Sequence, residues 1–309
     1  MSSAANKSAF DPTKVTAALK PLYGDFTIVK ELPSERDQNF LATLDGEGRD
    51  FAQVVIKIHN KEDARDVIRL QEELMSHVLK NDAAKKLNIL FQRTLPAANG
   101  ELCVTMEGHF VRVLEFMQGK MLGDVEQPPS VIENVGKAAA CVCNATKGFT
   151  TTVPTDYTHR DESFAWDLQH ALPHVKAYRK YISTDARKEI LDRAIAPFEK
   201  SEWQSVLKRL PRGIIHNDMN DQNLVVGDGS IAILDWGDAS YTYVIADPAI
   251  CVPYLMFGKP DPFEDSFIPF VKGFTSEFSL NGDELKCLFP LAILRMATSV
   301  VMSAYGATV

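Results

Sequence analysis

Short apolar runs separated by polar turns fill the first third of the chain, which is the pattern of an antiparallel sheet. Strands are expected at 26–30, 40–44, 51–59, 102–106 and 110–116, with helices at 13–22 and 61–79. The helix at 61–79 is indicated by apolar residues at helical spacing, Val67, Leu70, Leu74 and Val78. We therefore expect a five-stranded antiparallel sheet with one helix against it, preceded by a disordered leader over 1–11.

After Gln118-Gly119 the spacing of apolar residues becomes mainly helical. Helices are expected at 130–147, 164–172, 184–208, 263–278 and 283–304. One hairpin interrupts them, because the apolar runs 224–226 and 231–234 flank Gly227-Asp228-Gly229. The sequence thus predicts an α+β protein with an N-terminal lobe over 1–114, a hinge at 115–119 and a helical lobe over 120–309.

The predicted hairpin is bordered by the residue types that phosphoryl transfer requires. Its entry carries His216, Asp218 and Asn223 in the spacing H-x-D-x-x-x-x-N, and Asp235 follows its second strand. A hairpin brings its ends together, so these side chains can converge as a base and oxygen ligands for Mg²⁺-bound phosphates. Asp and Asn beside Gly are also ordinary turn residues. The joint spacing is harder to explain by turns alone.

This arrangement resembles the kinase-like phosphotransferases of the aminoglycoside phosphotransferase and choline kinase group. Asn217 stands where protein kinases have the Arg of H-R-D, and Asp235-Trp236-Gly237 stands in place of D-F-G. The resemblance implies a two-lobed, protein-kinase-like fold and a small-molecule acceptor. It also implies that Asp218 is the catalytic base, that Asn223 and Asp235 bind Mg²⁺, and that His216 braces the loop by hydrogen bonding.

Lys57 lies in Val54-Val55-Ile56-Lys57-Ile58, which is comparable with the V-A-I-K strand of kinases. A Lys among aliphatic residues needs an anionic partner, which a phosphate or a helix Glu can supply, unless it reaches to water at a strand edge. Its expected helix partner is Glu72, with Glu73 and Glu62 as alternatives.

Two further segments are candidates for holding the nucleotide. The loop 33–40 occupies the place of a phosphate loop but contains no glycine. Its backbone amides and the side chains of Ser34, Gln38 and Asn39 are therefore the candidates for binding phosphate. A polar hairpin turn without a ligand is the alternative interpretation. At the hinge, backbone groups of Glu115 and Met117 are expected to recognise the base.

A narrower resemblance rests on Asp37-Gln38-Asn39-Phe40, His159-Arg160, Asn220-Asp221-Gln222-Asn223 and Gly237-Asp238-Ala239-Ser240-Tyr241. These segments are similar to the hydroxylysine kinase family, from about residue 20 to the end. The resemblance implies transfer of the terminal phosphate of GTP, or ATP, to 5-hydroxylysine in amino-acid catabolism. Homoserine, choline and aminoglycosides are alternative acceptors, and a non-catalytic nucleotide-binding protein is the alternative class. Family members continue past the position of Val309, so a shortened form is expected.

An amino-acid acceptor needs partners for its ammonium and carboxylate groups. Asp238 and Asp221 are candidates for an ammonium group, and Arg160 is a candidate for lining the pocket. Arg295 lies in an apolar helix, where an unpaired charge is costly. It therefore pairs either with a substrate carboxylate or with an acidic side chain of the protein.

Composition narrows the partners further. The net charge of −8 over 309 residues gives no indication of a nucleic-acid or anionic-membrane partner. The five cysteines are odd in number and scattered, which favours buried free thiols in a reducing compartment such as the cytoplasm. The stretch 288–309 is nearly long enough to span a bilayer, but Pro290 and Arg295 interrupt it, so a buried helix is expected.

Overall fold

The structure is a computed structural model that describes residues 9–34, 36–46 and 52–308. The chain is a mixed α+β protein that divides into two compact units. The first comprises the residues up to Leu79 together with Phe91–Gln118, and the second comprises Lys80–Leu90 and everything from Gly119 onward. Residues 1–8 of the expected leader lie outside the described residues.

The first unit is built on an antiparallel sheet with the order β1-β2-β3-β7-β5, with β6 also paired to β7. Its strands are β1 (Phe26–Leu32), β2 (Gln38–Leu44), β3 (Gln53–Ile58), β5 (Thr94–Leu95), β6 (Val104–Met106) and β7 (His109–Glu115). Its helices are α1 (Pro12–Tyr23) and α2 (Arg65–Val78). The expected strands are all present, and the short strand β5 adds a sixth.

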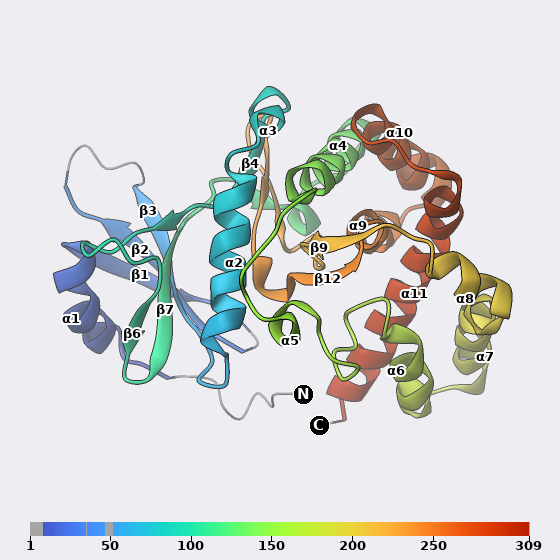
Figure 1. Cartoon of the computed structure of the whole chain (residues 1–309), viewed down its shortest axis with the longest axis horizontal. Coiled ribbons are helices and arrows are strands. Elements are labelled where there is room, and N and C mark those ends of the chain that lie inside the picture. Colours follow the sequence, from blue (N-terminus) through green and yellow to red (C-terminus); the bar gives the residue numbers. More distant parts are fainter. Residues whose placement is uncertain (1–8, 35, 47–51, 309) are drawn as a thin grey trace. The chain divides into compact units, whose positions relative to one another are not determined.

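The two faces of this sheet carry different side chains. Val111 and Val113 of β7 point into an apolar cluster that includes Val15 and Leu19 of α1. Arg112 between them points to the opposite face, where it contacts α2. Helix α2 lies along the sheet in Figure 1. Because side chains alternate along a strand, Lys57 and its cross-strand neighbour Arg112 share that face.

The second unit is mainly helical and contains two small antiparallel sheets. The sheets have the orders β4-β11-β10-β8 and β12-β9, with β4 (Ile89–Phe91), β8 (Lys120–Met121), β9 (Arg212–Ile215), β10 (Leu224–Val226), β11 (Ile231–Ile233) and β12 (Ser240–Tyr243). The helices are α3 (Asp82–Lys86), α4 (Pro129–Thr146), α5 (Thr155–Thr158), α6 (Ala171–Tyr178), α7 (Asp185–Ile195), α8 (Ser201–Leu207), α9 (Ala246–Met256), α10 (Ile268–Glu277) and α11 (Gly282–Gly306). The expected hairpin is β10–β11.

Two of the expected helices were wrong in extent. Residues 164–170 form turns, because the buried Asp167 accepts hydrogen bonds from Gln169 N (3.0 Å) and Thr242 Oγ1 (2.7 Å), and such local bonds compete with a helix. The segment 184–208 is divided into α7 and α8 by a 3₁₀ turn that contains Pro197, which lacks the N–H for an α-helical hydrogen bond.

Helix α11 is long and apolar enough to cross a membrane by length and composition. In this structure its apolar residues pack inside the second unit. Cys287, Leu288, Leu291 and Leu294 belong to the same buried cluster as residues of α6, α7 and α9. The expectation of a buried helix is confirmed, and so is the expectation of buried free thiols for all five cysteines.

Helices α4 and α10 cross so closely that glycine is required at the contact. A Cβ at Gly273 would overlap the backbone carbonyl of Glu133, and one at Gly136 would overlap that of Phe270. Backbone atoms cannot move aside as a flexible side chain can, so the helices would have to separate. This crossing helps to fix the wall of the second unit.

We expect Gly273→Ala to lower the free energy of unfolding by about 2 to 3 kcal/mol, because the added methyl group overpacks the helix crossing. Urea unfolding followed by circular dichroism measures this change. Gly282→Ala is the matched control, since a Cβ there meets open space at the start of α11. Equal stability of the two variants would contradict the close crossing.

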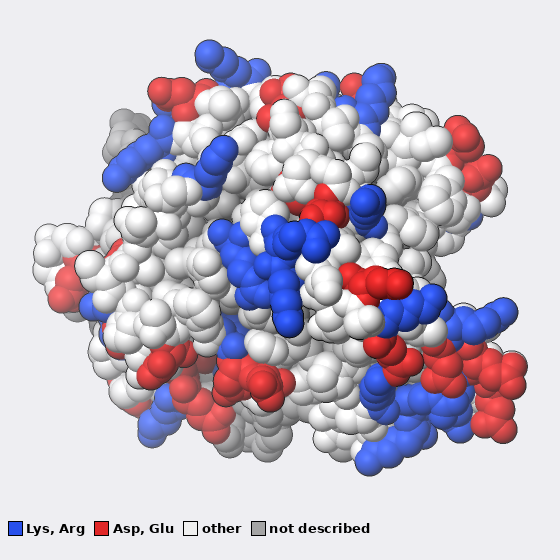
Figure 2. All heavy atoms as spheres, turned by 45° about the vertical axis from the view of Figure 1, so that its right-hand side comes forward, with Lys and Arg blue, Asp and Glu red and all other residues white. Residues whose placement is uncertain are grey.

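Charges of both signs are interspersed on the face shown in Figure 2. Lys and Arg side chains form one continuous group at the centre of this face, and both signs lie side by side toward its lower right, so neither sign covers the whole face. An anionic ligand must therefore be held by individual cations and backbone groups on this face rather than by a general positive potential.

Candidate active site

His216 holds the start of the loop between β9 and β10 in place. It is fully buried and packs against the ring of Trp236, with centroids 4.6 Å apart. Its Nε2 donates to the carbonyl of Leu234 (2.7 Å), and its Nδ1 accepts the backbone N–H of Asp218 (3.2 Å). One imidazole therefore ties Asp218 to the residue that precedes Asp235. These contacts are those of a bracing residue.

Asp247, in the first turn of α9, holds the same loop from another direction. Its two carboxylate oxygens accept the backbone N–H groups of His216 (3.1 Å) and Asn217 (2.7 Å). Burial raises the pKa of Asp247 to about 6, and the opposing effects of His216 and the backbone donors limit the rise. This role was not foreseen from the sequence. The available signal was a lone carboxylate in an otherwise apolar stretch, which needs hydrogen-bond donors when it is buried.

The carboxylate of Asp218 is oriented by three side chains. Its Oδ1 accepts from Arg295 Nη2 (2.7 Å) and Asn220 Nδ2 (3.0 Å). Its Oδ2 accepts from Asn223 Nδ2 (2.7 Å). A carboxylate held at both oxygens has a fixed direction, which a group that receives a proton from a bound hydroxyl needs.

The hairpin places the residue before Asp235 directly beside Asn223. The backbone N–H of Leu234 donates to the carbonyl of Asn223 (2.9 Å), and Asp235 directly follows Leu234 in the chain. Asn223 uses its Nδ2 to bind Asp218, which leaves Oδ1 as the ligand atom. Asp235 is exposed and has a left-handed backbone with φ 48°. This set of amide and carboxylate oxygens fits a hard cation such as Mg²⁺.

Arg295 forms the internal salt bridge that was one of its two expected alternatives. It is 3% exposed, and its guanidinium stacks over Trp166 (4.5 Å to the ring centroid) while Nε donates to Tyr254 Oη (3.2 Å). Its third contact is Asp218. With its nitrogens engaged by the protein, Arg295 acts in this structure on the candidate base rather than as an open carboxylate receptor.

Of the other expected acceptor-binding residues, Asp238 and Arg160 lie close to the loop. Burial raises the pKa of Asp238 to about 7, and the nearby charge of Asp218 adds to the rise. Arg160 donates through Nη2 to the carbonyl of Gly237 (2.7 Å) and stacks on Phe164. Asp221 lies three residues after Asp218 in the same loop. Its pKa is also raised by burial.

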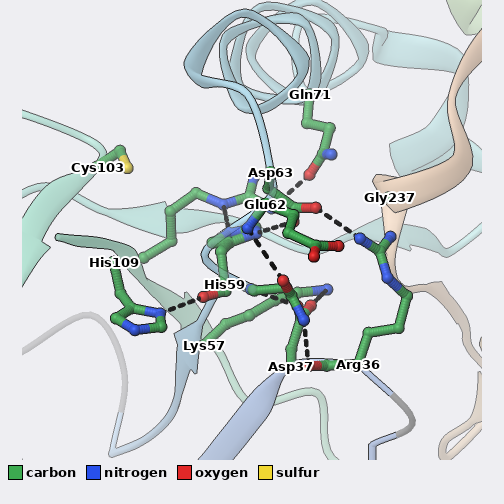
Figure 3. A network of polar contacts seen from close by, with 12 residues as sticks. Arg36, Asp37, Lys57, His59, Glu62, Asp63, Gln71, Cys103, His109 and Gly237 are labelled. Atoms are coloured by element: carbon green, nitrogen blue, oxygen red, sulfur yellow. Dashed lines mark hydrogen bonds and ion pairs between the residues drawn. The ribbon is translucent and has the colours of Figure 1, made fainter. Parts of the chain in front are cut away.

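In the first unit, the expected pairing of Lys57 with Glu72 was wrong for this structure. Lys57 Nζ lies 3.2 Å from Asp37 Oδ2, across the β2–β3 pair. Glu72 Oε2 accepts hydrogen bonds from both terminal nitrogens of Arg65 (3.0 Å each), a residue of the same helix. Glu72 Oε1 is buried without a hydrogen-bond partner among the described residues. The loop aspartate lies beside Lys57 instead (Figure 3).

The expected phosphate loop is only partly described, because residue 35 lies outside the described residues. Ser34 Oγ accepts the backbone N–H of Asp37 (3.2 Å). Gln38 is buried and exchanges two hydrogen bonds with the backbone of Phe10 (2.8 and 3.1 Å), so it ties the N-terminal segment to β2 instead of presenting its amide to phosphate. Asn39 stands opposite Lys57 in the ladder, and its buried Oδ1 has no hydrogen-bond partner among the described residues.

The two hinge candidates differ in what their backbones can offer. Glu115 already donates its N–H to Arg93 O (2.8 Å) and accepts at its carbonyl from the Gln92 amide (2.8 Å). The N–H and C=O of Met117 make no backbone hydrogen bond within the described part of the chain. Met117 is therefore the better candidate for recognising a base through its backbone.

Just after the end of β3, a buried histidine contacts the segment that precedes α2 (Figure 3). His59 is 2% exposed and accepts Nε of Arg112 at its own Nε2 (3.0 Å), so its Nδ1 carries the proton and faces Asp63 Oδ2 (3.3 Å). Both ring nitrogens are thus engaged, which leaves no lone pair for a metal ion. Burial, with the charge of Arg112, lowers the pKa of His59 to about 4.

We expect this histidine to make the protein acid-sensitive. The pKa of His59 falls from 6.5 when unfolded to about 4 when folded, so between these values the unfolded chain binds the extra proton. Stability is therefore fully present above pH 6.5 and falls by about 3 kcal/mol as the pH drops through this window. Urea unfolding between pH 7.5 and 4 should show a flatter dependence for His59→Gln. Identical slopes for the two proteins would contradict this role.

Known proteins and solved structures resemble this chain over most of its length. The phosphotransferase enzyme family APH matches residues 28–269. A hydroxylysine kinase from Danio rerio is 31% identical over 99% of this chain and 86% of its own length, and one from Mus musculus is 27% identical over 99% and 85%. The solved structure of an amicoumacin kinase with AMP-PNP and Ca²⁺ has a TM-score of 0.68 at 18% identity, over 96% of this chain and 87% of that one.

The family match covers most of the chain, including both the Lys57 strand and the loop that carries His216, Asp218 and Asn223. The structural likeness independently places the fold among kinase-like phosphotransferases. The chain therefore belongs to the APH phosphotransferase enzyme family, within its hydroxylysine kinase branch, and is a phosphotransferase that acts on a hydroxyl group.

Proposed function

We propose that this protein transfers the terminal phosphate of GTP to the side-chain hydroxyl of 5-hydroxylysine. Support for the acceptor comes from the hydroxylysine kinases that match nearly the whole chain. The observation that carries the chemistry is the fixed carboxylate of Asp218, which Asn223 and Arg295 hold at opposite oxygens (both 2.7 Å). A carboxylate so placed is suited to orient an acceptor hydroxyl.

Each residue has a distinct task in this reaction. Asp218 accepts the hydrogen bond of the substrate hydroxyl and then its proton. Asn223 and Asp235 would hold Mg²⁺, which neutralises phosphate charge when it is bound. Lys57 exchanges its Asp37 partner for a phosphate oxygen. Asn39, opposite Lys57, offers a buried amide beside the same strand.

Steady-state assays of acceptors against nucleotides test this proposal. The purified protein, with Mg²⁺, is offered 5-hydroxylysine, homoserine, choline and an aminoglycoside, each with GTP and with ATP. We expect the highest kcat/KM for 5-hydroxylysine with GTP. Turnover of homoserine or choline without turnover of 5-hydroxylysine would overturn the acceptor, and a preference for ATP would overturn the donor.

A non-catalytic nucleotide-binding protein is the competing class, and it makes a different prediction. Such a protein would bind GTP without producing a phosphorylated acceptor. Nucleotide binding measured by calorimetry, in parallel with product detection, separates the two. Binding without product for every acceptor would favour the competing class.

A further inference from the structure

A cavity of about 550 Å³ opens beside the catalytic loop in the second unit. Asp221 forms one part of its wall, and Tyr254 and Lys259, from the end of α9 and the segment after it, form another. Tyr254 also accepts a hydrogen bond from Arg295, which contacts Asp218. The cavity is therefore connected to the candidate base through two side-chain contacts. Its volume is within the range of small-molecule sites.

Two charges in this wall lack an ionic partner. Asp221 is half-buried, and within the described residues no cation lies within salt-bridge distance of its carboxylate. Lys259 is half-buried and donates to the carbonyl of Gln127 (3.0 Å), and it has no acidic partner in the part of the chain that the structure describes. A half-buried charge without a counter-ion is costly, so a ligand of complementary charge would be favoured.

Asp238 is a third such charge, and it lies close enough to Asp218 for the two carboxylates to interact. It is half-buried, and the charges of Asp218, Arg160 and Arg295 all act on it. Its carboxylate makes no hydrogen bond or ion pair with any described residue. A cation placed beside it would also offset the repulsion between Asp238 and Asp218.

We propose that these three charges recognise the three charged groups of 5-hydroxylysine. Asp238 binds the side-chain ammonium, Asp221 binds the α-ammonium, and Lys259 binds the α-carboxylate. The inference rests on the proposed function. In the substrate the side-chain ammonium is attached to the carbon next to the hydroxyl carbon, so it must lie close to Asp218. The α-amino-acid end is several bonds away and fits the cavity.

Gly123 supplies independent evidence for the position of Asp221. A Cβ at Gly123 would lie 2.7 Å from Asp221 Oδ2 and 2.5 Å from Gln222 Nε2. The glycine therefore leaves room for this carboxylate in the cavity wall. Gly123→Ala displaces the carboxylate without removing its charge, which provides a second variant should Asp221→Asn fold poorly.

The test uses two truncated acceptors. 1-Amino-2-propanol keeps the hydroxyl and its neighbouring ammonium but lacks the amino-acid end. 2-Amino-5-hydroxyhexanoate keeps the amino-acid end and the hydroxyl but lacks the side-chain ammonium. Comparing kcat/KM among these and 5-hydroxylysine assigns each protein charge to one end of the substrate.

For Asp221→Asn and Lys259→Met, we expect the kcat/KM ratio of 5-hydroxylysine to 1-amino-2-propanol to fall about 10- to 100-fold, mainly through KM. Gly123→Ala should lower the same ratio to a smaller extent. Asp238→Asn should instead lower the ratio of 5-hydroxylysine to 2-amino-5-hydroxyhexanoate, leaving the first ratio within about threefold of wild type. Matched controls are Asp228→Asn and Lys200→Met, two exposed residues away from the cavity.

Ratios that do not change in Asp221→Asn, Gly123→Ala and Lys259→Met, or that change equally for both truncated acceptors, would overturn the assignment. This failure is distinguishable from failure of the proposed function. In the first case wild-type protein phosphorylates 5-hydroxylysine but the variants show no end-specific loss. In the second case wild-type protein does not phosphorylate 5-hydroxylysine at all.

Discussion

Asp218→Asn should lower kcat by about 10³-fold while leaving KM for GTP little changed. An amide at this position can still accept from Asn223 but cannot take the proton of the acceptor hydroxyl. The residues proposed to hold the nucleotide are unchanged in this variant, so nucleotide binding should persist. Initial rates with 5-hydroxylysine at saturating GTP, together with calorimetric GTP binding, measure both quantities. A kcat within tenfold of wild type would show that Asp218 is not the base.

This variant needs a stability control, because Asp218 also neutralises Arg295. That guanidinium is 3% exposed, and removal of its anion leaves a buried charge, at a cost of about 3 kcal/mol. The double variant Asp218→Asn/Arg295→Met removes both charges. It should be more stable than Asp218→Asn alone and equally inactive, which would separate the loss of chemistry from the loss of stability.

Arg295→Met should lower kcat about 100-fold, because Asp218 then keeps only its amide partners and loses its fixed direction. The Arg295–Asp218 contact (2.7 Å) and the stacking on Trp166 define the orientation that is lost. KM for GTP should change little. The unfolding free energy should also fall, since Asp218 loses its cationic partner.

Arg295→Lys is the conservative control for this second prediction. Lysine keeps the charge but cannot make the three contacts to Asp218, Tyr254 and Trp166 at once. Its kcat should lie between those of wild type and Arg295→Met. Wild-type kcat in both variants would contradict a positioning role, and a change confined to KM for the acceptor would indicate a carboxylate-binding role instead.

The sequence was sufficient to predict the β10–β11 hairpin, because local rules determine it. Gly227-Asp228-Gly229 between two apolar runs specifies a tight turn, and the turn fixes which residues lie at the strand ends. Asn223 and Leu234 are consequently joined by a backbone hydrogen bond. The closeness of Asn223 to the residue before Asp235 therefore followed from sequence spacing alone.

Contacts between distant segments could not be predicted in the same way. The pairing of Lys57 with Asp37 depends on strand register. The hydrogen bonds of Arg65 to Glu72 depend on side-chain conformations that helix spacing does not specify. The role of Asp247 was missed because α9 contains Pro248 and Pro253, which hide a helix in the sequence. Its carboxylate function appears only when the catalytic loop is folded against it.

The position of the transferred phosphate tests the proposed reaction most directly. Wild-type protein is incubated with Mg²⁺, GTP labelled at its terminal phosphate and 5-hydroxylysine, and the product is examined by mass spectrometry and ³¹P NMR. We expect the label as a phosphate ester on the side-chain hydroxyl, formed in equal amount to GDP, and absent with Asp218→Asn. GTP consumption that releases only inorganic phosphate, or label on another group, would contradict the account.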